Sequence, residues 1–413
     1  MEAAGALGRA RPHTYLEALR EGVRARSRVF WIVAGLTVLA AALRLATLGL
    51  QSYHHDEIVT ASRILRDGFW HAMDAVGFSE SAPPLYYALA WAWTQLTGTG
   101  EFGLRSFSAL AGVATVPVAF LIGTELRGRW TGIVVAALVA VNPMLVWYSQ
   151  EARAYALFGL LTALSLLYFV RALERGRRRD FLAWGVASGL ALATHYFAAF
   201  PVLAEALWLL ARRRRQSLPG LAIVGGAGLL LAPLAIHQMS IGHAEWIGNF
   251  TLGHRLGETA LTFVLGETGD IISRPTHPLL ALAPCLLAVA GMALVLVRGE
   301  PRERRAAGTP LALAAVTVGV PLGLALLDPS KDYVLARNLM PAVVPLLVAL
   351  SVGFTLRRAR RAGAALAAAT VACSLGFSIW ASVSPALQRP DWDAVAAAIG
   401  EPARPRAMVT WTL

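Results

Sequence analysis

The sequence predicts an all-α, polytopic membrane protein with about eleven membrane-spanning helices. Hydrophobic residues make up 56% of the 413 positions and charged residues only 15%, and the mean hydropathy is +0.56. This composition is too apolar for an ordinary soluble domain. Apolar stretches of about 17 to 25 residues recur along the chain, each long enough to cross about 30 Å of hydrocarbon as a helix.

The net charge of +12 comes from arginines that gather in short clusters between the apolar stretches. This distribution marks the cytoplasmic side of membrane proteins, and it argues against nucleic acid as the partner. Residues 1–28 are Arg-rich and have no apolar core, so we expect a cytoplasmic segment rather than a signal peptide. The clusters are Arg24/Arg26/Arg28, Arg127/Arg129, Arg175/Arg177/Arg178/Arg179, Arg212 to Arg215, Arg302/Arg304/Arg305 and Arg357/Arg358/Arg360/Arg361.

With the N-terminus inside, the predicted spans alternate in direction and bring every arginine cluster to the cytoplasmic side. Leu85 to Thr97 is not counted, because about 13 residues are too few to cross and its Trp and Tyr residues favour a helix in the interface. The predicted spans are Val29 to Leu48, Leu104 to Leu126, Trp130 to Trp147, Ala156 to Leu173, Phe181 to Thr194, Phe197 to Ala211, Leu218 to Ile236, Pro278 to Val297, Pro310 to Leu327, Leu339 to Leu356 and Ala362 to Val383.

Three regions follow from this assignment. Residues 1–28 are the cytoplasmic segment, residues 29–383 form the transmembrane domain, and residues 384–413 form an external tail too short for an independent domain. Residues 49–103 form a long first external loop that carries interfacial helices. Arg44 lies near the outer end of the first span and is expected to snorkel to the surface. Cys285 and Cys373 fall inside apolar stretches and are interpreted as small buried hydrophobes.

The first external loop begins with a cluster of ionisable residues, His54-His55-Asp56-Glu57. Charged groups at a membrane boundary are functional by default. Asp56 is a candidate general base with Glu57 as an assisting carboxylate, and either histidine is placed to orient a substrate or bind a metal. The alternative is structural, with Asp56 capping a helix that begins at Ile58. Direct succession of these residues lacks the spacing of known metal motifs, which argues against a zinc site.

A second external segment, Tyr148 to Tyr155, combines a carboxylate, a guanidinium and two phenols. If it is helical, Glu151 and Tyr155 share one face. Arg153 is suited to bind a phosphate through its fork of donors. The alternative is an ion pair that locks the ends of two helices.

Other external residues complete the list of candidates. Arg337 and Lys331 are cations at the same face, with a solvated loop charge as the alternative for Lys331. His195 and Tyr196 are placed to contact a phosphate or sugar, or to form an interfacial pair. Trp246 is placed to stack on a sugar or a prenyl chain, although aromatic residues favour membrane interfaces in any case.

These motifs, in this order, resemble the glycosyltransferase C superfamily. The resemblance is closest to the bacterial relatives of protein O-mannosyltransferases and lipid A aminoarabinose transferase, a group similar to glycosyltransferase family 39, and it runs from about Leu45 to Trp392. Asn338 stands where that group usually has an aromatic residue. The motifs are His54 to Glu57, Ser81 to Tyr87, Glu101 to Arg105, Tyr148 to Tyr155 and Arg337 to Pro341.

The resemblance implies a membrane glycosyltransferase with its active site on the extracytoplasmic face. It would move a hexose such as mannose, or a pentose, from a polyprenyl-phosphate donor to a hydroxyl of a glycan, lipid or protein acceptor, with inversion. Asp56 would be the base and Glu57 would assist it, Arg105 would anchor the first loop, and Glu151 would be the acidic residue of the second motif. The short tail leaves the acceptor open, and the resemblance leaves a divalent metal open.

Two other classes compete with the enzyme. A transporter or flippase for a lipid-linked or small polar substrate also has many helices and boundary charges, but its coupling residues would lie near the bilayer midplane. A structural membrane protein would not need acidic and basic groups converging on one face. We therefore expect a transferase.

Overall fold

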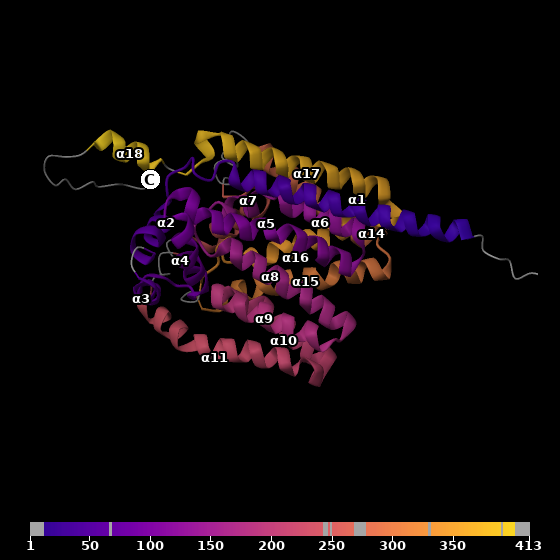
Figure 1. Cartoon of the computed structure of the whole chain (residues 1–413), viewed down its shortest axis with the longest axis horizontal. Helices are drawn as coiled ribbons and strands as arrows, with labels where there is room; N and C mark the ends of the chain where they lie inside the picture. Colours follow the sequence, from indigo (N-terminus) through magenta and orange to yellow (C-terminus); the bar gives the residue numbers. More distant parts are fainter. Residues whose placement is uncertain are drawn as a thin grey trace, which may run out of the picture.

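The structure, a computed structural model, describes residues 12–65, 68–242, 247, 250–267, 278–328, 332–389 and 391–400. These residues form helices and connecting turns with no strand, which confirms the predicted fold class. The long helices run roughly along one direction, and the short helices α2 (His55–Val59), α3 (Phe69–Ser79) and α4 (Leu85–Thr97) gather at one end of the bundle (Figure 1). This end is called the loop end below.

Each of the predicted spans corresponds to a helix or to a pair of helical segments. In chain order they are α1 (Pro12–Leu45), α5 (Glu101–Leu126), α6 (Arg129–Val141) with α7 (Pro143–Ser149), α8 (Tyr155–Arg175), α9 (Arg178–Thr194), α10 (Ala199–Arg213), α11 (Leu218–Ile241), α14 (Pro278–Arg298), α15 (Pro301–Leu327), the turn Met340–Ala342 with α16 (Val343–Phe354), and α17 (Arg360–Val383). The remaining helices are α12 (Leu252–Leu265) and α18 (Trp392–Ile399).

Length and apolar composition identify fewer certain spans than the sequence predicts. Among the described residues, six helical stretches are long and apolar enough to cross a membrane, or seven if the bent pair α6 and α7 is one span. One of these stretches, Tyr196–Ile241, contains both α10 and α11. The chain is therefore a multi-pass membrane protein, and the number of eleven spans stays a prediction.

The interfacial helix of the first loop has the predicted bounds. Helix α4 covers Leu85–Thr97 and packs against α3 and α5 at the loop end. It begins after Pro83-Pro84 and ends at Gly98, whose φ of 77° is accessible to glycine at little cost. Proline and glycine thus limit the helix to a length that cannot cross the membrane.

Helices α5 and α6 approach each other closely through two glycines. A Cβ atom at Gly123 would lie 2.8 Å from the Cα atom of Gly132, and a Cβ atom at Gly132 would lie 2.5 Å from the Phe120 carbonyl oxygen. Small residues permit this close packing in membranes, where apolar burial gives helices little reason to associate. Helices α1 and α8 pack against α5 as well, so α5 lies at the centre of the helices that support the loop end.

Arg44 does not snorkel, contrary to the expectation. The helical axis bends by 55° between α6 and α7, at Asn142-Pro143, which leaves carbonyl groups at the end of α6 without helical partners. Arg44 is fully buried and donates to the carbonyl oxygens of Ala140 at 2.8 Å and Val139 at 3.2 Å, and to Ser149 Oγ at 3.1 Å. The Arg44 charge is tolerated inside the bundle because carbonyl oxygens at the helix break accept its hydrogen bonds.

Candidate active site

Four segments that are distant in the sequence meet at the loop end. They are α2, the turn between α7 and α8, the segment before Met340, and the tail after α17 (Figure 1). Helix α2 begins at His55, three residues before the predicted start at Ile58. Asp56 therefore lies within the first turn and is not the helix cap, while Glu57 accepts a hydrogen bond from the His54 backbone N–H at 2.9 Å.

Glu57 and Arg105 form a buried ion pair beneath the site. Arg105 Nε and Nη2 donate to the two carboxylate oxygens at 2.8 and 2.7 Å, and the backbone N–H of Ala152 donates at 2.7 Å. The side chains are 1% and 0% exposed. Burial would raise the pKa of Glu57, but the hydrogen bonds and charge of Arg105 lower it below its usual value. The pair joins the first loop to α5 and to the α7–α8 turn.

Asp56 lies beside Arg337 and is more accessible than Glu57. The distance from Arg337 Nη1 to Asp56 Oδ2 is 3.3 Å, and the two side chains are 25% and 29% exposed. The guanidinium carbon of Arg337 is also 6.0 Å from the centre of the Tyr155 ring. Burial would raise the pKa of Asp56, but Arg153 and Arg337 together lower it below its usual value. Asp56 is therefore a carboxylate at neutral pH.

Arg153, predicted to bind a phosphate, has its donors directed at another carboxylate. Its Nη1 and Nη2 donate to the two oxygens of Glu80 at 2.8 and 2.7 Å, and Nη1 also donates to Thr60 Oγ1 at 3.2 Å. This is the structural alternative considered for Arg153, an ion pair that locks helix ends. Its partner Glu80 follows α3 and was not identified from the sequence, because nothing local marks residues 73 positions apart as partners.

The segment Tyr148 to Tyr155 is not one helix, so Glu151 and Tyr155 do not share a helix face. Helix α7 ends at Ser149 and α8 begins at Tyr155. Gln150 holds the turn against the end of α1, because its Nε2 donates to Thr47 Oγ1 at 2.9 Å and to the Leu43 carbonyl oxygen at 3.1 Å. The break places Glu151 in a buried turn.

Glu151 faces a cation that the sequence did not single out. Arg389, in the tail, has its Nη2 atom 3.6 Å from Glu151 Oε2, and the side chains are 4% and 7% exposed. Burial is the main reason that the pKa of Glu151 rises to about 7, while Arg389 opposes the rise. The position of Arg389 in a Pro-rich tail did not indicate a role at the site.

The predicted phosphate contacts His195 and Tyr196 lie against protein groups. The His195 ring stacks on Phe158 with ring centres 4.6 Å apart, and its Nδ1 accepts from the Phe197 backbone N–H at 3.3 Å. Burial lowers the pKa of His195 to about 3, so the ring is neutral and gives no cation for a phosphate. Tyr196 donates to Gln238 Oε1 at 2.8 Å, which ties α11 to the end of α9.

The two histidines of the first loop differ in exposure. His55 is exposed, and His54 is half-buried with a pKa that burial lowers below the usual value. Across the part of the chain that the structure describes, no three His, Cys, Asp or Glu side chains lie together as a metal site would require. Trp246 and Lys331 lie outside the described residues.

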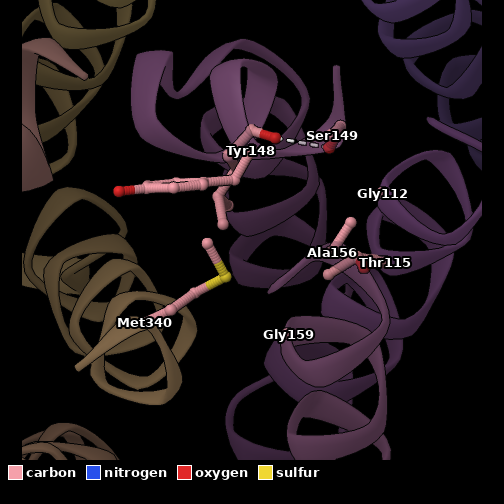
Figure 2. Close-up of a pocket in the computed structure, with 8 residues that line it drawn as sticks. Gly112, Thr115, Tyr148, Ser149, Ala156, Gly159 and Met340 are labelled. Carbon is pink, nitrogen blue, oxygen red and sulfur yellow. Dashed lines mark hydrogen bonds between the residues drawn. The ribbon is translucent and has the colours of Figure 1, made fainter. Parts of the chain in front are cut away.

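A small cavity lies directly behind the site. It has a volume of about 10 Å³, which is about the room of one water molecule, and its wall includes Tyr148, Met340 and three small residues (Figure 2). Ser149 at its edge donates to the Leu145 carbonyl oxygen. The Tyr148 hydroxyl donates to Glu267, and the Tyr148 and Tyr155 rings are 5.0 Å apart. The three small residues are Gly112, Ala156 and Gly159.

Comparison with known proteins gives one match by sequence family and several by fold. Residues 81–237 match the family described as dolichyl-phosphate-mannose-protein mannosyltransferase. A search of the curated proteins by sequence found no match. The family match begins just before α4 and ends in α11, so it covers Glu151 and Arg153 but neither Asp56 nor Arg337.

Two solved proteins share the fold at low sequence identity. ArnT from Cupriavidus metallidurans in the apo state has a TM-score of 0.54 and 17% identity over 83% of this chain and 62% of that chain. The apo oligosaccharyltransferase of Archaeoglobus fulgidus has a TM-score of 0.54 and 12% identity over 89% and 57%. The same archaeal enzyme, AglB, in complex with an inhibitory peptide and a dolichol-phosphate has a TM-score of 0.52 and 13% identity over 87% and 56%. The chain spans less than two thirds of the length of each.

Proposed function

We propose that this chain, a glycosyltransferase C protein by its fold and by the family match at residues 81–237, transfers a sugar from a polyprenyl-phosphate donor to a hydroxyl acceptor. The donor class rests on the name of the matching family and on the dolichol-phosphate bound to the archaeal oligosaccharyltransferase. The sugar is a hexose such as mannose, or a pentose. The acceptor is a glycan, a lipid or a protein.

The observation that carries the proposal is the accessible pair Asp56 and Arg337. A transferase of this kind needs a base for the acceptor hydroxyl and a cation for the departing phosphate. Asp56 is ionised, and Arg337 lies 3.3 Å from it while keeping a quarter of its side chain exposed. The two residues are 281 positions apart, so the fold, and not a local motif, brings base and cation together.

The reaction proceeds as a single displacement in this proposal. The acceptor oxygen attacks the anomeric carbon as its proton passes to the Asp56 carboxylate, and the bond from that carbon to the phosphate oxygen breaks. Polyprenyl phosphate leaves with the electron pair, and Arg337 stabilises the charge that grows on it. Attack opposite to the leaving group inverts the anomeric configuration.

The neighbouring charges have supporting roles in this proposal. Glu57 accepts four hydrogen bonds from protein groups and is fully buried, so we assign it to positioning the loop rather than to assisting the base. Arg105 anchors the same loop. Arg153 donates to both carboxylate oxygens of Glu80, so we assign phosphate binding to Arg337 instead. His54, His55 and Tyr155 border the pair.

The loop end is proposed to be extracytoplasmic. The arginine clusters at Arg127/Arg129, Arg175 to Arg179 and Arg212 to Arg215 lie at the opposite ends of the helices that lead to the site. Cytoplasmic placement of these clusters puts α2, α3 and α4 on the outer face. The donor would then enter from the outer leaflet.

Two charged groups inside the described spans argue against the transporter alternative. Glu205, in α10, is a buried carboxylate, but it accepts from Trp184 Nε1 at 2.8 Å and from Ser165 Oγ within the bundle. Arg44 donates hydrogen bonds to carbonyl oxygens at the end of α6. Both groups have the partners expected of helix packing rather than of a substrate path.

The test is sugar transfer by purified protein in vesicles, with radiolabelled polyprenyl-phosphate mannose and a polyprenyl-phosphate pentose as donors. The Asp56→Asn variant should lose transfer and keep its fold. Asp74→Asn is the matched control, because Asp74 is an exposed aspartate on α3 at the same end. Wild-type turnover by Asp56→Asn would refute the base, and movement of labelled lipid across the bilayer without transfer would favour the flippase.

A further inference from the structure

The tail after α17 folds back onto the first loop. The turn Pro385–Leu387 directs the chain toward α2, and Leu387 is buried with Leu265 and Phe377. The Arg389 backbone N–H donates to Gln51 Oε1 at 3.3 Å, and the Trp392 N–H donates to Ser52 Oγ at 2.8 Å. Two backbone bonds to consecutive loop residues fix where the Arg389 side chain enters the site.

The Arg389 guanidinium is enclosed between an aromatic ring and a carboxylate. Its central carbon is 4.4 Å from the centre of the Trp147 ring, a distance typical of a cation–π contact. Its Nη2 atom lies 3.6 Å from Glu151 Oε2 and makes no hydrogen bond within the described residues. A buried guanidinium in this position acts on Glu151 through its charge.

The charged form of Glu151 depends on such a cation. A buried carboxylate is costly unless paired, and Glu57 nearby adds a second negative charge. Arg389 is the cation that most favours the charged form, ahead of Arg337 and Arg153. The titratable or charged groups that face Glu151 are Arg389 of the tail, Glu57 of α2, Arg337 of the segment before Met340, Arg153 of its own turn, Tyr86 of α4, Tyr148 of α7 and Tyr155 of α8.

We infer that Arg389 is a positioning residue of the active site, which holds the Glu151 carboxylate in place beside the Asp56–Arg337 pair and favours its charged form. The catalytic role of Arg389 rests on the proposed function, but its contact with Glu151 does not depend on that function. The tail then contributes a residue to the active site. Without Arg389, a larger share of Glu151 is protonated at neutral pH, and the cluster loses that much negative charge.

The test compares the Arg389→Gln and Arg389→Lys variants by the infrared carboxyl band of Glu151, identified by its absence in Glu151→Gln. Loss of an opposite charge within about 4 Å raises the pKa of a carboxyl by about 1 to 3 pH units. In Arg389→Gln we expect the midpoint pH of this band to rise by that amount. In Arg389→Lys the midpoint should stay close to that of the wild type. An unchanged titration in Arg389→Gln would overturn the inference.

Transfer rates provide the second readout. A shift of one pH unit from a midpoint near 7 leaves about a tenth of Glu151 ionised at pH 7, which lowers a rate that depends on it about fivefold. The acid limb of the pH profile should move upward in Arg389→Gln, and Arg389→Lys should restore it. Arg358→Ala is the control, because that arginine is 70% exposed.

Two further results separate the possible failures. If wild-type protein transfers no sugar but the Glu151 band shifts in Arg389→Gln, the proposed function fails and the contact stands. If Arg389→Gln does not fold, the double variant Glu151→Gln/Arg389→Gln should restore folding, since no buried charge is left unpaired. A double variant that also fails to fold would overturn the inference.

Discussion

Removing the Arg105 side chain is expected to destabilise the protein strongly. Arg105 uses all five of its N–H donors, two on Glu57 and three on the carbonyl oxygens of Leu48, Gln51 and Ser52, at distances from 2.6 to 3.0 Å. Arg105→Ala leaves the Glu57 charge buried without its partner, which costs about 3 to 5 kcal/mol. The three carbonyl groups that lose their donor place the cost near the upper end of that range.

The assay is apparent thermal unfolding in detergent, followed by size-exclusion chromatography at a fixed heating rate. Arg171→Ala is the control, since Glu125 keeps Arg175 as a second partner and no buried charge is left unpaired. Arg105→Lys keeps the charge but not the planar fork, so its unfolding temperature should fall between the two. Equal melting of Arg105→Ala and Arg171→Ala would refute the reasoning.

Three further predictions concern the base, the packing and the topology. Asp56 must be ionised to accept a proton, and its pKa lies below the usual value. Below the step near pH 7 that we assign to Glu151, transfer should therefore fall a second time as the pH drops through the Asp56 pKa. Arg337→Gln should move this second loss to higher pH, and an unmoved second step would count against the pair. Gly123→Ala should cost about 1 to 3 kcal/mol of stability through a clash with α6, whereas Gly35→Ala, which meets nothing within 4 Å, should melt like the wild type. A cysteine placed at Ser79 should react with an impermeant reagent from outside intact cells, and labelling only after lysis would reverse the proposed orientation.

The sequence predicted the helices well because apolar length and breakers are local properties. Helix α4 has the predicted bounds, since prolines precede it and Gly98 follows it. The predicted span Trp130 to Trp147 is instead two helices that meet at Asn142-Pro143, and the break is stable because Arg44 from α1 supplies hydrogen bonds to α6. A donor located 96 residues away leaves no mark in the local pattern.

The candidate residues were easier to find than their partners. Asp56, Glu57, Glu151, Arg153 and Arg337 all lie at the loop end, as their grouping at the predicted external face indicated. Which carboxylate pairs with which arginine depends on side-chain reach in the folded bundle. Glu80 and Arg389 therefore became visible only in the structure, one as the partner of Arg153 and the other as the partner of Glu151.

The folding back of the tail has a consequence for biosynthesis. Residues 51 and 52 of the first loop leave the ribosome more than three hundred residues before the backbone groups of Arg389 and Trp392 that bond them. In the proposed orientation the loop is translocated first, and its bonds to the tail form only after the remaining helices have been made. Arg389 follows α17, so a chain that stalls before the end of α17 would carry Glu151 in its turn without Arg389 beside it.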